Sequence, residues 1–377
     1  MKVEKIGWTE NGWGFEQTSV QPDLVLYFGS ARQIEATSAP SVLSERFPGA
    51  LLLGCSTSGG IVGNEIDDQG IVGVTCSFRD TTVRLVEADV ADSAGSENCG
   101  RALGDALRGE NLAGVFVLSD GVQVDGTKLA AGIQREIGTM PISGGLAGDG
   151  ARFERTLVGC GRTARTGRVA AIGFYGNAVR LAHASGAGWE PFGPKRRITR
   201  SHGNTIAELD GKPALQLYER YLGEDAANLP GSGLLFPLLV WDTDVPQLTY
   251  VRTVLGIDRA AGTISFGGDV PEGWAAQLMR GSLDGLIDGS IGAVERLLQS
   301  SEAIPQSETL AMMVSCIGRN LVLGQRTEEE VRPASEAFGS GVTGFYAHGV
   351  IVPDAATHTA TLQNQTMSLT LIHEATG

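Results

Sequence analysis

The sequence predicts an α/β (α+β) protein of two modules, in which mixed, largely antiparallel sheets are flanked by helices in a layered sandwich. Two observations support this prediction. Short apolar segments bounded by glycine or proline alternate with amphipathic helical segments in the first part of the chain, which favours strand–helix–strand units. Later apolar segments follow one another across short polar turns, which favours antiparallel hairpins.

The predicted elements follow in chain order. We expect strands at residues 23–28, 51–53, 71–78, 82–88, 114–118, 152–159, 168–175, 179–185, 195–201, 205–209, 233–240, 248–255, 262–266, 310–316 and 344–349, and a last strand that carries 364–366. We expect helices at residues 31–47, 99–107, 127–137, 213–222, 274–279, 282–298 and 327–338. Apolar residues four apart, such as Leu129, Ile133 and Ile137, support the helical assignments.

Segments rich in glycine and proline predict the boundary between the two modules. Residues 186–194 form the strongest break in composition, because glycine and proline recur there around Trp189. Asp210-Gly211-Lys212-Pro213 interrupts the chain again, and its proline suits the first turn of a helix. We therefore expect an N-terminal module at residues 1–212 and a C-terminal module at residues 213–377.

Composition excludes several classes of protein. The chain has 377 residues, 42% of them hydrophobic, and a formal net charge of −14, which disfavours nucleic acids and anionic membranes as partners. The cysteines form no CxxC pair, so we expect neither a disulfide framework nor a zinc site. We find no signal peptide and no apolar run long enough for a membrane span. These features lead us to expect a cytoplasmic protein without membrane insertion.

Two small-residue loops follow predicted strands and offer polar groups at the strand ends. The first, Gly54–Gly60, contains Ser56 and Thr57, and its backbone N–H groups suit an anion; a tight glycine turn explains the same residues. The second loop, at residues 141–150, contains Asp149. Its carboxylate suits a ligand amine, and a turn-forming aspartate is the alternative. Ser56, Thr57 and Asp149 are therefore candidate ligand contacts, with turn formation as the alternative.

A larger set of polar side chains lies between residues 310 and 370. Arg319 follows an apolar strand, and its guanidinium suits a carboxylate ligand, but an ion pair with a glutamate at 328–330 is an ordinary alternative. Arg252 and Arg280 have the same two interpretations. The other candidate contacts in this set are Cys316, Tyr346, His348, Asn364 and Thr366.

Cys316 and two histidines raise alternatives to plain ligand binding. With His348 as its base, Cys316 is a candidate nucleophile for a thiol-dependent enzyme, although free cysteine is more often a small buried hydrophobe. His183 and His348 are the candidates for binding haem iron, and the histidines show no spacing typical of a metal site. No triad or nucleotide loop is evident, so we expect a non-catalytic protein without a cofactor, with haem as the alternative.

Several stretches, in this order, resemble the FIST family of sensory domains. They are GCSTSGG at 54–60, SDG at 119–121, GGLAGD at 144–149, ITRSHGNTIAELDGKPALQLY at 198–218, VRTVLGID at 251–258, GDVPEG at 268–273, SCIGRNLVLG at 315–324, GFYAHG at 344–349 and NQT at 364–366. The resemblance implies a module that binds a small ligand, such as an amino acid or other carboxylate, in the C-terminal module or between the modules. It also implies a kinase, cyclase or chemoreceptor as a separate partner, or output through an oligomer.

One segment departs from the family pattern. Where relatives usually show GFYSYGEI or similar, this chain has Ala347-His348-Gly349-Val350. A histidine replaces an aromatic residue, and a valine replaces an acidic one. If that acidic group binds a ligand amine in relatives, the preferred ligand differs here. The resemblance also supports the haem alternative, because a subset of FIST-like proteins resembles nitric-oxide-sensing haem proteins.

Overall fold

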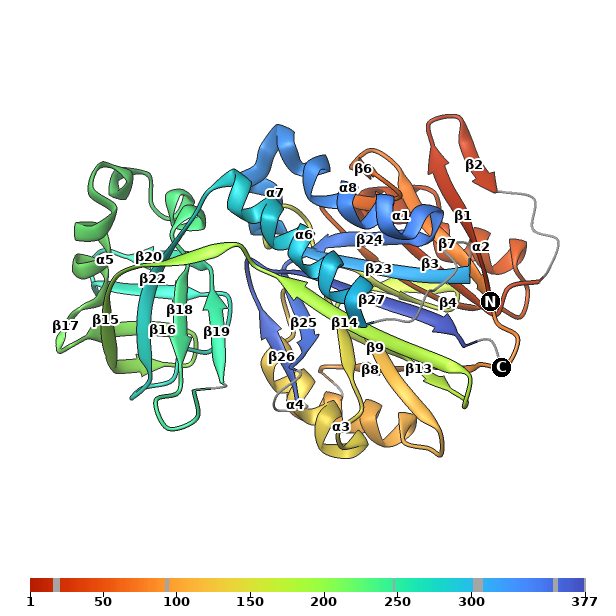
Figure 1. Cartoon of the computed structure of the whole chain (residues 1–377), viewed down its shortest axis with the longest axis horizontal. Coiled ribbons are helices and arrows are strands. Elements are labelled where there is room, and N and C mark those ends of the chain that lie inside the picture. Colours follow the sequence, from red (N-terminus) through yellow and green to blue (C-terminus); the bar gives the residue numbers. More distant parts are fainter. Residues whose placement is uncertain (16–20, 92–94, 247, 301–307, 355–358, 376–377) are drawn as a thin grey trace.

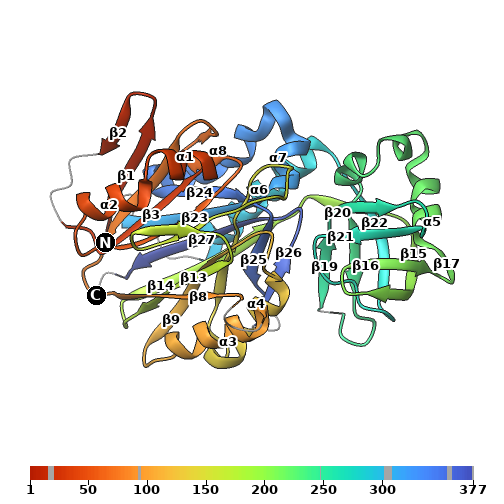
Figure 2. The same ribbon diagram turned by 180° about the vertical axis from the view of Figure 1, so that it is seen from behind.

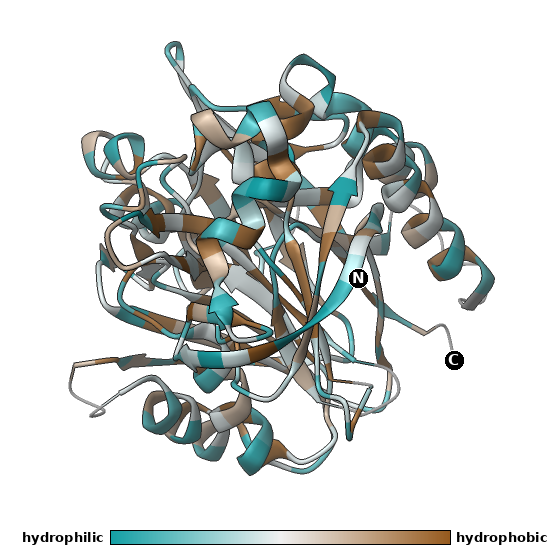
Figure 3. Ribbon diagram, turned by 90° about the vertical axis from the view of Figure 1, so that its left-hand side faces the viewer, coloured by the Kyte–Doolittle hydropathy of each residue, from teal (hydrophilic) through white to brown (hydrophobic). Residues whose placement is uncertain are grey.

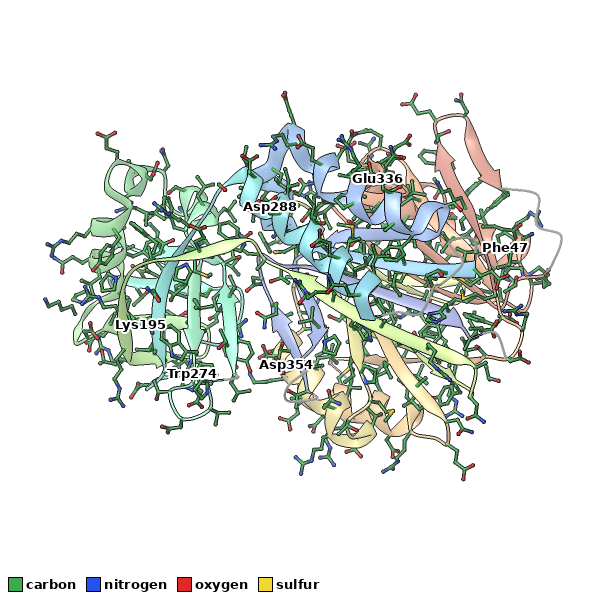
Figure 4. All side chains as sticks on the ribbon, in the orientation of Figure 1. Phe47, Lys195, Trp274, Asp288, Glu336 and Asp354 are labelled. Carbon is green, nitrogen blue, oxygen red and sulfur yellow. The ribbon has the colours of Figure 1, made fainter. Side chains whose placement is uncertain are left out.

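The computed structural model describes residues 1–15, 21–91, 95–246, 248–300, 308–354 and 359–375. It shows two bodies side by side, and both chain termini lie in the larger one (Figure 1). We call residues 187–281 the small domain and the other described residues the main body. Figure 4 labels Lys195 and Trp274 in the small domain, and Asp288 and Asp354 on the side of the main body nearer to it.

Three sheets form the main body, and the strands of each follow in their spatial order. The first sheet contains β12 (Thr163–Arg165), β11 (Val158–Cys160), β4 (Leu51–Ser56), β3 (Leu24–Gly29), β7 (Ile71–Ser77), β1 (Lys2–Thr9) and β2 (Gly12–Phe15). The second contains β26 (Ala360–Gln363), β25 (Gly349–Pro353), β10 (Ile142–Leu146), β9 (Leu112–Ser119), β13 (Arg168–Tyr175) and β8 (Thr82–Asp89). The third contains β14 (Val179–Gly186), β27 (Met367–Glu374), β23 (Thr309–Cys316), β24 (Val342–Ala347), β5 (Gly60–Val62) and β6 (Glu65–Asp67).

The small domain is built on a fourth sheet with its own apolar core. In spatial order the sheet contains β19 (Thr249–Arg252), β18 (Leu238–Trp241), β22 (Ala275–Gly281), β15 (Trp189–His202), β16 (Thr205–Leu209), β21 (Thr263–Phe266) and β20 (Val254–Asp258), and β17 (Lys212–Pro213) pairs with β16. Helix α5 (Ala214–Leu222) packs on this sheet through Ala214, Leu215 and Tyr218. Short 3₁₀ turns follow at Gly223–Asn228 and Gly231–Leu235.

Each sheet of the main body contains one parallel strand pair joined by helices, as a parallel pair requires. The connections are α1 (Ala31–Ala36) and α2 (Ala39–Arg46) between β3 and β4, α4 (Gly126–Ile137) between β9 and β10, and α7 (Ile317–Leu323) and α8 (Thr327–Phe338) between β23 and β24. Short 3₁₀ turns at Gly324–Arg326 and Gly339–Gly341 flank α8. Backbone hydrogen bonds tie the loops at the strand ends together, from Ala147 N–H to the Ser119 carbonyl and from His348 N–H to the Leu146 carbonyl.

Buried apolar residues hold the three sheets together. Phe28 of the first sheet stacks on Phe345 of the third at 4.9 Å between ring centroids, and Phe116 of the second joins the same core. Side chains on β9 alternate between the two faces of the second sheet. Those on the face opposite to Phe116, such as Val115, pack against α3 (Ser96–Leu107) and α4, so the second sheet is buried on both faces. Helices α6 (Leu283–Ser300) and α8 cover the third sheet (Figure 2), and hydrophobic residues concentrate along the enclosed strands (Figure 3).

Two chain connections join the bodies, and both run beside α6. A Cβ added at Gly186 would lie 1.9 Å from the carbonyl oxygen of Gly289, and one at Gly188 (φ +75°) would lie 2.0 Å from that of Gly285. Only glycine permits this approach of the incoming connection to the helix. The outgoing connection leads from β22 into the start of α6. The two bodies are therefore anchored along one helix.

The predicted α+β class is confirmed, whereas three predicted elements are wrong. The predicted helix at residues 274–279 is replaced by strand β22, which begins at Ala275, because β15 and β18 supply pairing partners that local periodicity does not reveal. Residues 152–157 form a loop, and Gly231–Leu235 is a 3₁₀ turn. Strand pairing crosses the predicted boundary at residue 212, since β15 and β16 pair with β22 and β21 beyond it. As a division between sequence modules, that boundary stays a prediction. Among the described helices, none is long and apolar enough to cross a membrane.

Candidate functional site

Two cavities lie side by side between the small domain and the main body. Their volumes are about 150 Å³ and about 420 Å³, and Phe153, Leu255 and His348 line both. We call them the smaller and the larger cavity, and together the junction cleft. The main body contributes α7 and loops at the ends of its parallel strands, while the small domain contributes residues 253–255 and 266–269. Such a position beyond the carboxyl ends of parallel strands is a common ligand site.

His348 lies where the chain passes from the third sheet to the second, between β24 and β25. It is 7% exposed; its Nδ1 lies 3.2 Å from the carbonyl oxygen of Gly121, and its Nε2 lies 3.2 Å from the backbone nitrogen of Asp149. Nε2 also lies 3.2 Å from the carbonyl oxygen of Gly150 and 3.0 Å from Oδ1 of Asp149, so a proton on either ring nitrogen has an acceptor. Burial lowers the pKa of His348, and the Gly121 carbonyl and Asp149 oppose this shift in part.

Asp149 organises the loop that follows β10. Its carboxylate accepts backbone hydrogen bonds from Phe153 at 3.0 Å and from Glu154 and Arg155 at 2.9 Å, and it lies 3.0 Å from Nε2 of His348. Burial raises the pKa of Asp149, but the N–H groups of Arg155, Glu154 and Phe153, together with His348, outweigh burial and hold the pKa below its usual range. The carboxylate therefore fixes both the loop and the histidine.

The loop places an aromatic ring over the histidine. The ring of Phe153 stacks on His348 with 4.1 Å between centroids and 29° between planes. Its backbone has φ +54°, in the left-handed region that bulky residues rarely adopt, so the three hydrogen bonds to Asp149 help to hold a strained position. The Phe153 side chain is thereby presented to both cavities of the junction cleft.

The smaller cavity has apolar walls and two buried polar atoms without a partner. The Thr253 hydroxyl neither donates nor accepts a hydrogen bond within the described part of the chain, and Asn364 Oδ1 accepts none there, even though Thr253 is only 5% exposed and Asn364 only 2%. Buried polar atoms normally have partners, because desolvation without one is costly. Apolar side chains form most of the remaining lining: Phe153, Leu234, Val254, Leu255, Ile317 and Leu321.

Several large apolar side chains at the junction cleft face solvent. Leu255 and Leu321 are each 42% exposed at the smaller cavity, and Val122 is 43% exposed at the larger one. Together with Phe153 they form an apolar rim around a concave surface. Exposed apolar groups gathered at one concavity are typical of binding sites.

Cys316 lines the smaller cavity but is not prepared as a nucleophile. It is 2% exposed, and burial raises the pKa of its thiol. The ring nitrogens of His348 contact Gly121 and Asp149, so within the described part of the chain this histidine directs no nitrogen at the thiol. The predicted cysteine and histidine thus share a cavity without forming a nucleophile–base pair.

Arg319 forms an ion pair with a nearby glutamate, which the sequence offered as the alternative to ligand binding. It is fully buried, its Nε donates to Glu330, and its other nitrogens donate to the carbonyl groups of Ala187, Leu286 and Gln365. The buried hydroxyl of predicted contact Tyr346 donates to the same Glu330 carboxylate at 2.8 Å. Neither residue lines the junction cleft, so the prediction of Arg319 as a ligand anchor is not supported by its position.

The other predicted arginines are also engaged elsewhere. Arg252 is 1% exposed and donates to the carbonyl groups of Asp269 and Leu362, and burial lowers its pKa to about 10. Arg280 is exposed on β22, where its guanidinium lies over the ring of Phe192. Both cations lie outside the lining of the two cavities.

The remaining predicted contacts are dispersed. Ser56 Oγ accepts from the Leu157 N–H, and Thr57 Oγ1 donates to the Tyr346 carbonyl, so both tie loops together. Thr366 and His183 line a different cavity, of about 480 Å³, beside β14. Of the predicted residues, the structure brings Cys316, His348 and Asn364 to the junction cleft, with Asp149 directly behind His348. The departure at Val350 lies in the core, fully buried.

A larger concavity lies elsewhere, of about 890 Å³ along α5 on the small domain. Its walls carry charged side chains such as Lys212 and Arg220, and Arg259 in it pairs with Glu219. Among its described lining residues it lacks the unpartnered buried atoms and the apolar rim of the junction cleft, so we do not place the site there.

The sequence predictions missed most of the lining of the cleft, including four residues that shape it: Phe153, Thr253, Leu255 and Leu321. The residues around Phe153 in the sequence do not predict its positive φ. Leu255 and Leu321 have the pattern of ordinary apolar positions. Thr253 adjoins Arg252, whose charge is the more conspicuous feature of that segment. Domain packing, which brings the four together, is not a local property.

The chain matches known domains along most of its length. The FIST N domain matches residues 23–212, and the FIST C domain matches residues 214–353. A protein of Methanocaldococcus jannaschii, described as "Uncharacterized protein MJ1623", is 28% identical over 195 residues. These residues cover 48% of this chain and 37% of that protein, so the chain spans well under two thirds of that relative's length.

Proposed function

The chain belongs to the FIST family, whose domains are small-ligand sensory domains in signal transduction, and from that premise we propose that a small ligand binds in the junction cleft. One observation carries the proposal: two cavities meet at His348 where the small domain and the main body face each other. A ligand held there contacts both bodies and favours the arrangement in which both contacts form. The resulting change in the position of the small domain is the signal.

The output passes to a separate partner of the kinase, cyclase or chemoreceptor type, as the family resemblance implies. The expectation of an amino acid or other carboxylate as ligand came from the family resemblance, with Arg319, Arg252 and Arg280 as the candidate contacts for its carboxylate. Because these guanidinium groups are engaged outside the cleft, the class of ligand depends instead on the side chains that line the smaller cavity.

A thermal-shift panel of amino acids, small carboxylates and uncharged analogues tests the proposal, because a ligand that binds only the folded state raises the melting temperature. We expect at least one compound to stabilise the wild-type chain. Leu321→Trp fills the mouth of the smaller cavity from α7 and should abolish this shift. Leu298→Trp, at a 54% exposed position on α6 outside the cleft, is the matched control. Equal shifts in all three proteins would place the ligand elsewhere.

Haem binding is the second candidate function; of the two candidate ligands it depends on His183, because both ring nitrogens of His348 have hydrogen-bond partners. Burial lowers the pKa of His183 to about 4, its Nδ1 contacts Thr370, and its Nε2 has no hydrogen-bond partner within the described residues, as an iron ligand would require. The cavity beside it is lined by a mixture of small apolar residues, hydroxyl and amide side chains such as Ser368, and the charged side chains of Arg296 and Asp354, whereas a porphyrin needs flat apolar walls. The lining therefore does not fit haem. A Soret band on addition of haemin, lost in His183→Ala, would establish this alternative nonetheless.

A Cys316-dependent enzyme is the third candidate, and the raised pKa of the thiol argues against it. Alkylation at pH 7 checks this directly. Rapid and selective modification of Cys316 in the folded protein would favour the enzyme, and a rate far below that of free cysteine would eliminate it.

A further inference from the structure

The smaller cavity offers a ligand hydrogen-bonding atoms but no charge. Its polar side chains are those of Thr253, Cys316, His348 and Asn364. The thiol and the imidazole favour their neutral forms, because burial raises the pKa of Cys316 and lowers that of His348. Among the described residues of the lining there is no Lys, Arg, Asp or Glu. A charged ligand group would lose its hydration there without gaining a counter-charge.

Two buried charges beside the cavity, those of Arg252 and Asp149, are already compensated. The guanidinium of Arg252, adjacent to Thr253, donates to the carbonyl groups of Asp269 and Leu362 and lies 4.6 Å from the ring centroid of Tyr250. The Asp149 carboxylate behind His348 accepts three backbone hydrogen bonds. Redirecting either group toward a ligand would leave its present partners unpaired.

Thr253 and Asn364 define what the ligand must offer. The Thr253 hydroxyl can donate one hydrogen bond and accept others, whereas Asn364 Oδ1 only accepts. Both atoms lack partners within the described part of the chain and belong to different bodies, since Thr253 lies in the small domain and Asn364 in the main body. A ligand group with one acceptor and one N–H donor satisfies the pair and bridges the two bodies.

Resting on the proposed function, we propose that the smaller cavity selects an uncharged ligand with an apolar body and one carboxamide-like group. The carbonyl oxygen of that group accepts from the Thr253 hydroxyl, and its N–H donates to Asn364 Oδ1. The apolar body packs against Phe153, Leu234, Val254 and Leu321. This ligand class differs from the free amino acids and carboxylates that the sequence suggested.

Two matched series test the inference by titration calorimetry: 3-methylbutanamide, 3-methylbutanoate and 3-methylbutylamine, and benzamide, benzoate and benzylamine. Within each series the apolar body is nearly constant and the charge changes. We expect the amide to bind at least tenfold more tightly than either charged member. Binding of the carboxylate or the amine as tightly as the amide would overturn the inference.

Thr253→Val removes the hydroxyl at nearly constant shape and should weaken amide binding about five- to tenfold, as loss of one hydrogen bond predicts. Thr263→Val, the same change on β21 outside both cavities, should have no effect. Unchanged amide binding in Thr253→Val would contradict the inference. If Thr253→Val fails to fold, the ranking of the three wild-type affinities decides.

The binding experiments distinguish a failure of the carboxamide inference from a failure of the proposed function. If neither series binds but another compound stabilises the wild-type chain and not Leu321→Trp, the carboxamide class is wrong while the cleft remains the site. If every compound that binds does so equally in Leu321→Trp and Leu298→Trp, the proposed site itself fails, and the inference fails with it.

Discussion

Two buried clusters of ionisable side chains occupy strand ends of the main body, and they differ in how completely their polar atoms are used. In the Glu330 cluster, Arg319, Ser315 and Tyr346 all donate to one carboxylate, and both charged side chains are fully buried. In the Asp149 cluster, the carboxylate fixes a loop and His348, whose ring faces two cavities. The first cluster is closed and structural, whereas the second supports a surface that remains available to a ligand.

The comparison shows that residue type alone does not identify a site. An arginine at a strand end suits a carboxylate ligand, but Arg319 has no nitrogen left for one. The candidate site is marked instead by unpartnered polar atoms on Thr253 and Asn364 and by an exposed apolar rim. Three substitutions separate the two clusters and a pH series tests the buried histidines, in order of decreasing effect on stability.

Glu330→Ala should cause the largest loss of stability, about 3–5 kcal/mol, because it leaves the buried guanidinium of Arg319 without its counter-charge. Its neighbour on α8 provides a matched control: Glu329 pairs with Arg326 at the surface, and Glu329→Ala should leave the free energy of unfolding nearly unchanged. Urea unfolding measures both. Similar losses in the two variants would show that the Glu330 cluster is not a structural centre.

Asp149→Asn should have an intermediate effect, about 1–3 kcal/mol, because the amide provides one acceptor oxygen for three backbone N–H groups. Hydrogen exchange should accelerate across residues 150–157, and the thermal shift caused by ligand should disappear. Asp258→Asn, in a surface turn of the small domain, is the control and should change neither. Unaltered exchange in residues 150–157 would contradict the role given to Asp149.

Acid should destabilise the chain through its buried histidines. His183, with its pKa lowered to about 4, and His348 stay neutral in the folded state, whereas in the unfolded state they bind a proton below about pH 6.5. Their neutral forms therefore contribute full stability above that pH, and the contribution declines as the pH falls. The melting temperature should fall by several degrees from pH 7 to pH 5, and less in His183→Gln. Identical slopes in the two proteins would refute the contribution of His183.

Phe153→Ala should have the smallest effect on stability, below about 1 kcal/mol. The ring is 36% exposed, and its stacking on His348 contributes little to the free energy of unfolding. Ligand affinity should nevertheless fall severalfold, because the ring contributes to both cavities. A stability measurement combined with calorimetry separates the two effects. A large loss of stability with unchanged affinity would make Phe153 a structural residue.

Local sequence patterns predicted the parts of the fold that depend on local chemistry. The apolar strand Leu24–Gly29, buried throughout, and helix α4 were recognisable from composition and spacing. Strand β22 was mistaken for a helix because its identity depends on pairing with β15 and β18. The small domain itself was divided in two, since its strands come from both sides of residue 212.

The candidate site was predictable to a smaller extent. Cys316, His348 and Asn364 were identified because they are polar residues at strand ends, which the topology gathers at one face. Thr253 and Leu255 reach the same cavity only because the small domain rests on that face. Whether a polar atom is left without a partner depends on the complete packing, as the contrast between Arg319 and Asn364 shows.

Hydrogen–deuterium exchange with and without a stabilising ligand is the decisive test of ligand binding in the junction cleft. Binding there predicts slower exchange at three separated segments at once: residues 149–155, residues 251–256 of the small domain, and residues 316–322 on α7. Protection confined to α5 and residues 223–227, or to the strands around His183, would show that the ligand binds outside the junction cleft and would contradict the proposed function.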